Sequence, residues 1–375
     1  MKIEVHSPTI RRKEMDAVLT AMVEDRVGPG EYSRVLIQTA KEHLRFDFAL
    51  ALRSPATALH LALKALGLND GDGVLLSALS PHYYAQVLAD LRLTPMYCDV
   101  PSFSFPCISP ETVEKAISAR QADVQPRCIL LHHTLGFLPD TAAIAALGIP
   151  VVEDVSQSYR SQAAGQGREV ADKKRDDGQP ADKTPAVTAE APKPSRETAH
   201  GTFTVLGLEE RDMLTSGGGA LLFAMSRRDA SVLRGYSNLP PEYCLPDINS
   251  ALANVQFRET ERSLERRREI AGVYTQASLR TKHKHFVSLD GFEYNNYAFP
   301  LVLETSMKDV TAYARKKEII VENAFAKSLA GTGTVDSALC PTSYSLSLRT
   351  VLFPLYPRLR SAETERVAKL ITTLP

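Results

Sequence analysis

Few residues of this chain could do chemistry, and one carboxylate has the most informative position. Asp154 follows the short apolar run 149–152, so it should stand at the carboxyl end of a buried strand. Ligands of parallel α/β sheets bind beyond such strand ends, which makes Asp154 a candidate for ligand binding or acid–base chemistry. A strand-end residue that serves only local hydrogen bonding is the alternative interpretation of Asp154.

The remaining polar side chains show no spacing that specifies a metal site or a known nucleophile. His132 and His133 end a predicted strand, where histidines are more often packed than metal-ligating, and the other histidines lack ligand spacing. The five cysteines are scattered without a CxxC pair, and neither GxxxxGK[ST] nor GxSxG occurs. The sequence therefore predicts no metal site and no disulfide framework.

Composition excludes two broad classes of partner. The 44 basic and 44 acidic residues of this 375-residue chain cancel, which argues against binding nucleic acid or membranes through bulk positive charge. No apolar run approaches the ~20 residues that span a bilayer, and the N-terminus has no apolar signal segment. We expect a cytoplasmic protein with neither nucleic-acid nor membrane partners.

Helical and strand patterns alternate in the first half of the chain. The alternation predicts a mostly parallel sheet that is covered on both faces, in the α/β class. Apolar strand patterns fall at 74–76, 95–100, 128–132 and 149–152, and helical patterns fall at 57–68, 83–91, 111–119 and 141–147.

The rest of the chain predicts a second, smaller α+β domain after a long amphipathic helix at 259–279. We predict a large domain over 26–258 and a small domain over 259–375, with residues 1–25 associated with the small domain. Residues 161–198 contain no Leu, Ile, Phe, Tyr or Trp, so they should form a disordered insertion.

Several blocks, in order and spacing, resemble a known family. They include Ser54–Gly67 (SPATALHLALKALG), Ile149–Ser158 (IPVVEDVSQS) and Arg266–Tyr274 (RRREIAGVY). The chain resembles the DegT/DnrJ/StrS sugar aminotransferases, enzymes that depend on pyridoxal phosphate (PLP). The resemblance implies the PLP-transferase fold of type I, that of aspartate aminotransferase, and a homodimer whose active sites use both subunits.

The lysine that binds PLP as a Schiff base in that family is absent. Gly217, Gly218 and Gly219 set the register of the matching block, and they place Arg211 at the lysine position. An arginine stays protonated up to pH ~12, so it offers no neutral amine for this bond. The sequence therefore gives no confident catalytic residue.

The phosphate-binding residues that the resemblance implies are also altered. The family's Ser-Gly-Thr reads Ser54-Pro55-Ala56, which removes one N–H and one hydroxyl. The phosphate-binding serine is replaced by Leu206, and an asparagine supplied by the partner subunit is replaced by Glu242. A carboxylate beside a phosphate would repel it.

Two elements of the family's site remain. Asp154 matches the aspartate that keeps the pyridine nitrogen protonated, and Gln157 matches the glutamine near the ring. The stacking aromatic falls at Pro81, where His82 or Tyr83 could substitute. The candidate cofactor-binding residues are therefore Asp154, Gln157, Ser54, His82 and Tyr83. With no cofactor to balance its charge, Arg211 should point into the cleft and pair with Asp154, or with Glu242 of the partner subunit.

Three functions stay open at this point. The first is a degenerate aminotransferase without PLP chemistry that binds a sugar nucleotide or a protein partner in sugar-nucleotide or surface-glycan biosynthesis. The second is an active PLP-dependent sugar aminotransferase or related dehydratase. The third is an enzyme that reuses the cleft without PLP, so PLP is a cofactor only under the second.

Overall fold

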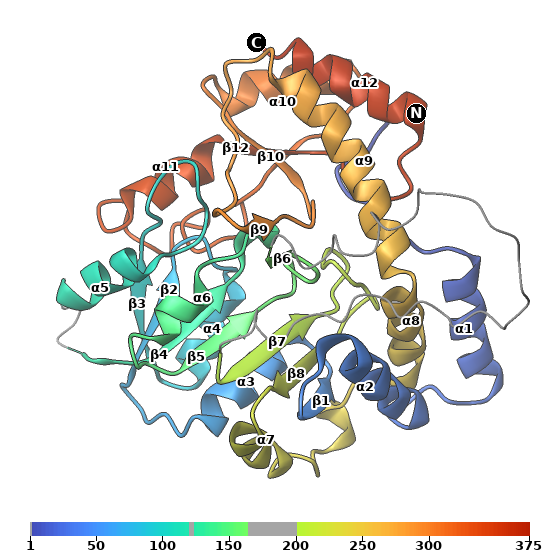
Figure 1. Cartoon of the computed structure of the whole chain (residues 1–375), viewed down its shortest axis with the longest axis vertical. Helices are drawn as coiled ribbons and strands as arrows, with labels where there is room; N and C mark the ends of the chain where they lie inside the picture. The colour runs from blue at the N-terminus through green and yellow to red at the C-terminus, as the bar shows by residue number, and fades with distance from the viewer. Residues whose placement is uncertain (1, 120–123, 164–200) are drawn as a thin grey trace, which may run out of the picture.

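The computed structural model describes residues 2–119, 124–163 and 201–375. Its central sheet comprises β1 (Phe48–Leu52), β2 (Gly73–Ser77), β3 (Thr94–Cys98), β4 (Pro126–His132), β5 (Val151–Asp154), β7 (Phe203–Gly207) and β8 (Ala220–Ala224). These strands lie in the order β1-β8-β7-β5-β4-β2-β3 (Figure 1). Strand β8 is antiparallel to both of its neighbours, whereas β7, β5, β4, β2 and β3 run parallel. The predicted mostly parallel sheet is confirmed.

Helices cover both faces of this sheet, which explains why its strands are continuous apolar runs. On β2, Val74 and Leu76 pack in one cluster with Leu59, whereas Leu75 packs in another with Val113. The helices of this part are α2 (Glu31–Leu44), α3 (Pro55–Ala65), α4 (Tyr83–Asp90), α5 (Pro110–Ser118), α6 (Thr141–Ala145), α7 (Arg227–Arg234) and α8 (Asp247–Arg258). Short 3₁₀ turns lie at Thr134–Gly136 and Pro241–Tyr243.

The C-terminal part has its own core and its own antiparallel sheet. It contains α9 (Thr260–Ser278), β10 (Phe299–Val302), α10 (Met307–Lys316), β11 (Glu322–Asn323), α11 (Pro341–Arg349), β12 (Thr350–Phe353) and α12 (Ser361–Thr372). The strand order is β10-β12-β11, and α9 packs against α12 (Figure 1). This is the smaller α+β part expected from the sequence.

The N-terminal segment contacts both parts of the molecule. Ile3 pairs with Ile319 and is buried in the C-terminal core, whereas α1 (Arg12–Val23) packs against α8. The position of Ile3 is therefore consistent with the proposed association of residues 1–25 with the small domain. The division at residues 25 and 258 stays a prediction.

The start of the expected disordered insertion was placed too early in the chain. Strand β6 (Gln162–Ala163) pairs with β9 (Phe292–Glu293), and the buried Ser161 hydroxyl donates to the Gly136 carbonyl. Ser161 is ordered because it also accepts the Asn295 N–H, so its polar groups bridge two segments. Residues 164–198 of the predicted insertion lie outside the described residues. Across the described ranges, every helix is too short or too polar to cross a membrane.

Candidate functional site

Two of the sequence candidates, Gln157 and Arg211, line a cavity of about 510 Å³. Residues from both parts of the molecule line it, because the turn after β7 and the loop after β5 meet β11 and the segment that follows it. The polar lining includes His132, Gln157, Arg211, Asp212, Tyr297, Glu322, Asn323 and Lys327. The volume falls in the range of small-molecule sites, roughly 300–1,000 Å³.

Asp154 ends β5 as predicted, and its carboxylate is fully occupied by neighbouring donors. Oδ1 accepts the Ser156 N–H at 3.0 Å and the Ser156 hydroxyl, while Oδ2 accepts the Tyr84 hydroxyl at 2.6 Å and the Tyr83 hydroxyl at 3.4 Å. An ionised carboxylate has about four acceptor sites. Four donors therefore engage Asp154, which is only 6% exposed.

The two tyrosines are held as donors by their surroundings. Burial and the nearby Asp154 charge raise the pKa of Tyr83 and of Tyr84 well above its ordinary value. Both hydroxyls therefore keep their protons, and the two rings pack edge to face with centroids 4.9 Å apart. Tyr83, one of the two residues suggested in place of the stacking aromatic, thus directs its hydroxyl to Asp154.

His82 takes no part in the cavity. Its side chain is exposed, its backbone N–H donates to the Lys327 carbonyl, and the preceding Pro81 lines the cavity instead. Pro81 forms a bridge to Ser328, which fixes this turn against the C-terminal part. His82 therefore does not take the place of an aromatic side chain in this cavity.

Arg211 pairs with a carboxylate that the sequence did not indicate. Its Nη1 lies 2.5 Å from Glu322 Oε2, and its Nη2 donates to Oε1 at 3.3 Å. The expected pair with Asp154 is therefore wrong. Because Asp154 is saturated by its own neighbours, the guanidinium binds Glu322 on β11, in the planar two-point geometry that arginine favours.

Asp212 is the titratable group that sequence reasoning missed. Burial and the neighbouring Asp154 charge raise the pKa of its carboxyl to about 7, although the Glu209 N–H donates to Oδ2 at 2.8 Å. Gly207 makes room for it, since a Cβ there would lie 2.3 Å from Asp212 Oδ2. Only its place next to Arg211 in the sequence could have drawn attention to it.

Gln157 lies in the cavity lining and holds the adjacent loop. Its side-chain oxygen accepts the Leu135 N–H at 2.7 Å. Leu135 has a left-handed backbone with φ of 54°, so this hydrogen bond fixes an unfavourable loop conformation. Gln157 therefore has a structural role that does not require a cofactor.

The phosphate-binding positions do not form a binding surface. The Ser54 hydroxyl caps α3 by accepting the Thr57 N–H at 3.1 Å, and Pro55 occupies the first helical position. Leu206 is 0% exposed and packs in the core between β7 and the neighbouring helices. Ser54, like Asp154, is absent from the cavity lining, whereas Gln157 lies in it.

The residues present do not fit PLP. Position 211 has no amine, Asp154 has no acceptor site left for a pyridine N–H, and Leu206 offers no hydroxyl to a phosphate. Glu242 is exposed on the 3₁₀ turn at 241–243, remote in sequence from every other candidate.

The two adjacent histidines, His132 and His133, are buried, and the described residues around them do not complete a metal site. Burial lowers the pKa of His132, and it lowers the pKa of His133 to about 3, so both rings are neutral at pH 7. His133 shares a hydrogen bond of 2.7 Å with the Ser158 hydroxyl. Within the part of the chain that the structure describes, no three His, Cys, Asp or Glu side chains could hold a metal ion.

Fold and site define an aminotransferase-like α/β protein. The model of the DegT/DnrJ/EryC1/StrS aminotransferase family matches residues 8–175 and 225–372, so the chain belongs to this family. The unmatched stretch between the two segments contains Arg211.

Several solved structures share the fold. The aminotransferase TlmJ from Streptoalloteichus hindustanus is 20% identical with a TM-score of 0.79, covering 99% of this chain and 98% of that one. Spr1654 from Streptococcus pneumoniae, in its PMP form, is 16% identical with a TM-score of 0.82, covering 100% and 97%. S. venezuelae DesV, in complex with a ketimine intermediate, is 17% identical with a TM-score of 0.80, covering 99% and 98%.

Proposed function

We propose that this protein is a degenerate family member that has lost PLP-dependent transamination and acts by binding. The observation that carries the proposal is Arg211, which occupies the lysine position and is held by Glu322 instead of facing Asp154. A guanidinium that stays charged cannot form the covalent bond on which transamination depends. The four donors on Asp154 support the same conclusion.

The ligand class follows from the relatives and from the cavity. The similar structures include proteins described as sugar aminotransferases, and the cavity of about 510 Å³ combines acidic, basic and amide side chains with an apolar wall. Such a lining suits a polyhydroxylated ligand with an anionic group. We therefore place the protein as a binding or regulatory partner in sugar-nucleotide or surface-glycan biosynthesis, in the cytoplasm.

Cofactor binding is the first experiment. The purified protein is mixed with PLP, desalted and examined by visible absorbance, and the product is reduced with borohydride and weighed by mass spectrometry. We expect a colourless protein of unchanged mass. A yellow protein whose colour is bleached by an amino donor would establish an active aminotransferase and overturn the proposal.

One observation favours a second function, an enzyme that uses the cleft without PLP. Asp212 combines a pKa of about 7 with a place in the cavity lining, and His132 lies in the same lining as a neutral base. A carboxyl that titrates near neutrality is suited to general acid–base work. Turnover of a sugar nucleotide by PLP-free protein, abolished in Asp212→Asn, would favour this function over simple binding.

We also propose a homodimer. Helix α1 exposes Met15, Leu19, Met22 and Val23, each at least 50% exposed, along one short stretch of surface. Exposed apolar side chains gathered in this way are typical of an interface. Light scattering at micromolar concentration should give twice the chain mass of 41.2 kDa, and a monomer mass would contradict the proposal.

A further inference from the structure

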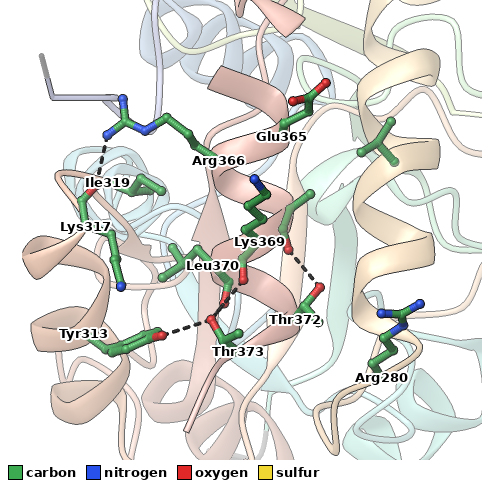
Figure 2. A pocket seen from close by; sticks show the side chains of 12 residues that line it. Arg280, Tyr313, Lys317, Ile319, Glu365, Arg366, Lys369, Leu370, Thr372 and Thr373 are labelled. Carbon is green, nitrogen blue, oxygen red and sulfur yellow. Dashed lines mark hydrogen bonds between the residues drawn. The ribbon is translucent and has the colours of Figure 1, made fainter. Parts of the chain in front are cut away.

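A second cavity lies away from the cleft, in the C-terminal part. It measures about 850 Å³ and is lined by the outer surface of α12 together with residues from α9, from α10 and from the segments just beyond them. Figure 2 shows Tyr313 and Lys317 on one side of α12, Arg280 on the other, and Lys369 on α12 between them. Sequence reasoning singled out none of these residues.

The polar lining of this cavity is strongly cationic in a chain without net charge. Four of its side chains are cationic and one, Glu365, is acidic. Three helices end at this cavity, and the carbonyls of one helix end amount to roughly half a unit of negative charge. Three ends offset only about half of the net positive charge of the lining, so an excess remains.

One of the four cations forms a hydrogen bond and an ion pair within the chain, and the other three form no ion pair with the described residues. Arg366 donates to the Lys317 carbonyl at 3.1 Å and lies 3.6 Å from Glu318. Lys317, Lys369 and Arg280 have no ion pair with any residue that the structure describes. Lys317 is held with its Nζ 5.7 Å from the centroid of the Tyr313 ring, over its face.

The floor of the cavity is apolar and its edge carries hydroxyls. Ile319 is 1% exposed and Leu370 2% exposed beneath the cations. The Tyr313 hydroxyl donates to Thr373 Oγ1 at 2.9 Å, which fixes the ring at the cavity edge (Figure 2). A ligand that fits must therefore combine several negative charges with a planar or apolar body and hydroxyl groups.

We propose that this cavity is a binding site for a nucleoside diphosphate, independent of the cleft. The two phosphate groups of such a ligand carry about three negative charges near neutral pH, since a terminal phosphate titrates with a pKa near ~6. That charge matches the three unpaired cations. The nucleoside lies over Ile319 and Leu370 beside the Tyr313 ring, and its ribose reaches the threonine hydroxyls.

Calorimetry with ADP tests the site, with pyrophosphate and adenosine as the two halves of the probe. We expect ADP to bind one site per chain, pyrophosphate to bind more weakly because it lacks the nucleoside, and adenosine to bind weakest because it lacks charge. If ADP does not bind, or if pyrophosphate binds as tightly as ADP, the proposal is wrong.

Paired variants assign the binding to this cavity. Lys317→Gln with Lys369→Gln should weaken ADP binding about tenfold, the effect of losing two exposed charge contacts. Lys308→Gln with Lys316→Gln removes the same charge from exposed α10 positions outside the lining and should change affinity less than twofold. If both double variants weakened ADP binding equally, the effect would come from the overall charge of the protein, and the proposed site would be wrong. Loss of ADP binding in Arg211→Gln would place ADP in the cleft and also overturn it.

Discussion

Replacing Arg211 by lysine separates the missing amine from the other changes in the cleft. The Arg211–Glu322 pair is half exposed, with side-chain exposures of 49% and 37%, so it contributes only about 0.2–1 kcal/mol to stability. Lysine keeps the positive charge and can still reach Glu322. The free energy of unfolding should therefore change by less than about 1 kcal/mol, and the variant should be folded.

We expect the folded Arg211→Lys variant to stay without PLP activity. The new amine would lack the remaining contacts, because Tyr84 and Ser156 occupy Asp154 and the buried Leu206 replaces a phosphate-binding hydroxyl. Each lost charge-assisted hydrogen bond to a cofactor costs about 1.5–3 kcal/mol, so two of them weaken binding roughly 10²–10⁴-fold.

The assay compares Arg211→Lys with Arg228→Lys, which places an equivalent lysine on the exposed surface of α7. Both proteins are incubated with PLP, reduced with borohydride, digested and mapped by mass spectrometry. Labelling at position 211 should not exceed the labelling at position 228. A coloured Arg211→Lys protein that turns over an amino donor would refute this account of the cleft, because Asp154 would then be available after all.

Two further variants test the buried groups around Asp154. Tyr84→Phe removes a buried 2.6 Å hydrogen bond to a carboxylate and should lower the free energy of unfolding by about 1.5–3 kcal/mol in urea titrations. The control Tyr32→Phe removes an exposed hydrogen bond of 3.0 Å to Glu24 and should lower it by less than about 1 kcal/mol. Equal losses of unfolding free energy in the two variants would show that the buried hydrogen bond to Asp154 contributes no more stability than an exposed one. Asp212 has a folded-state pKa of about 7, above its ordinary value of 3.8, so the stability that it contributes is full below pH 4 and is lost as the pH rises through 7. Melting temperatures measured from pH 4 to pH 8 should therefore rise with pH in Asp212→Asn relative to the unchanged chain, and a constant difference between the two would contradict the shift.

The sequence predicted the sheet well where burial leaves a simple pattern. Strands β2 and β4 contain continuous apolar runs because both faces of the sheet are covered, and each strand is followed by a helix with apolar spacing. Strands β1 and β12 were not identified as such. Both strands, Phe48–Leu52 and Thr350–Phe353, are largely apolar, but each follows closely on a helix that also contains apolar residues. The spacing of apolar residues alone therefore does not show where the helix ends and the strand begins.

The sequence predicted which residues lie near the cleft, but it did not predict which side chains they contact. Gln157 and Arg211 line the cleft, and Asp154 ends β5 beside His132, which also lines it. The partners of Arg211 and Asp154 could not be predicted, because Glu322 comes from β11 and Tyr84 from α4, far away in the sequence. Hydrogen bonds between side chains depend on the packing of whole elements, which no local pattern encodes.

The charge of Asp154 is balanced by hydrogen-bond donors within the chain. A carboxylate that is 6% exposed needs donors, since an unpaired buried charge costs several kcal/mol. In a PLP enzyme of this family the protonated pyridine nitrogen meets that need, and the resemblance assigns it to the position of Asp154. Here the hydroxyls of Tyr84 and Ser156 meet it from within the chain. Under the proposed function, folding and the charge of Asp154 therefore need no cofactor, so an arginine at position 211 leaves both in balance.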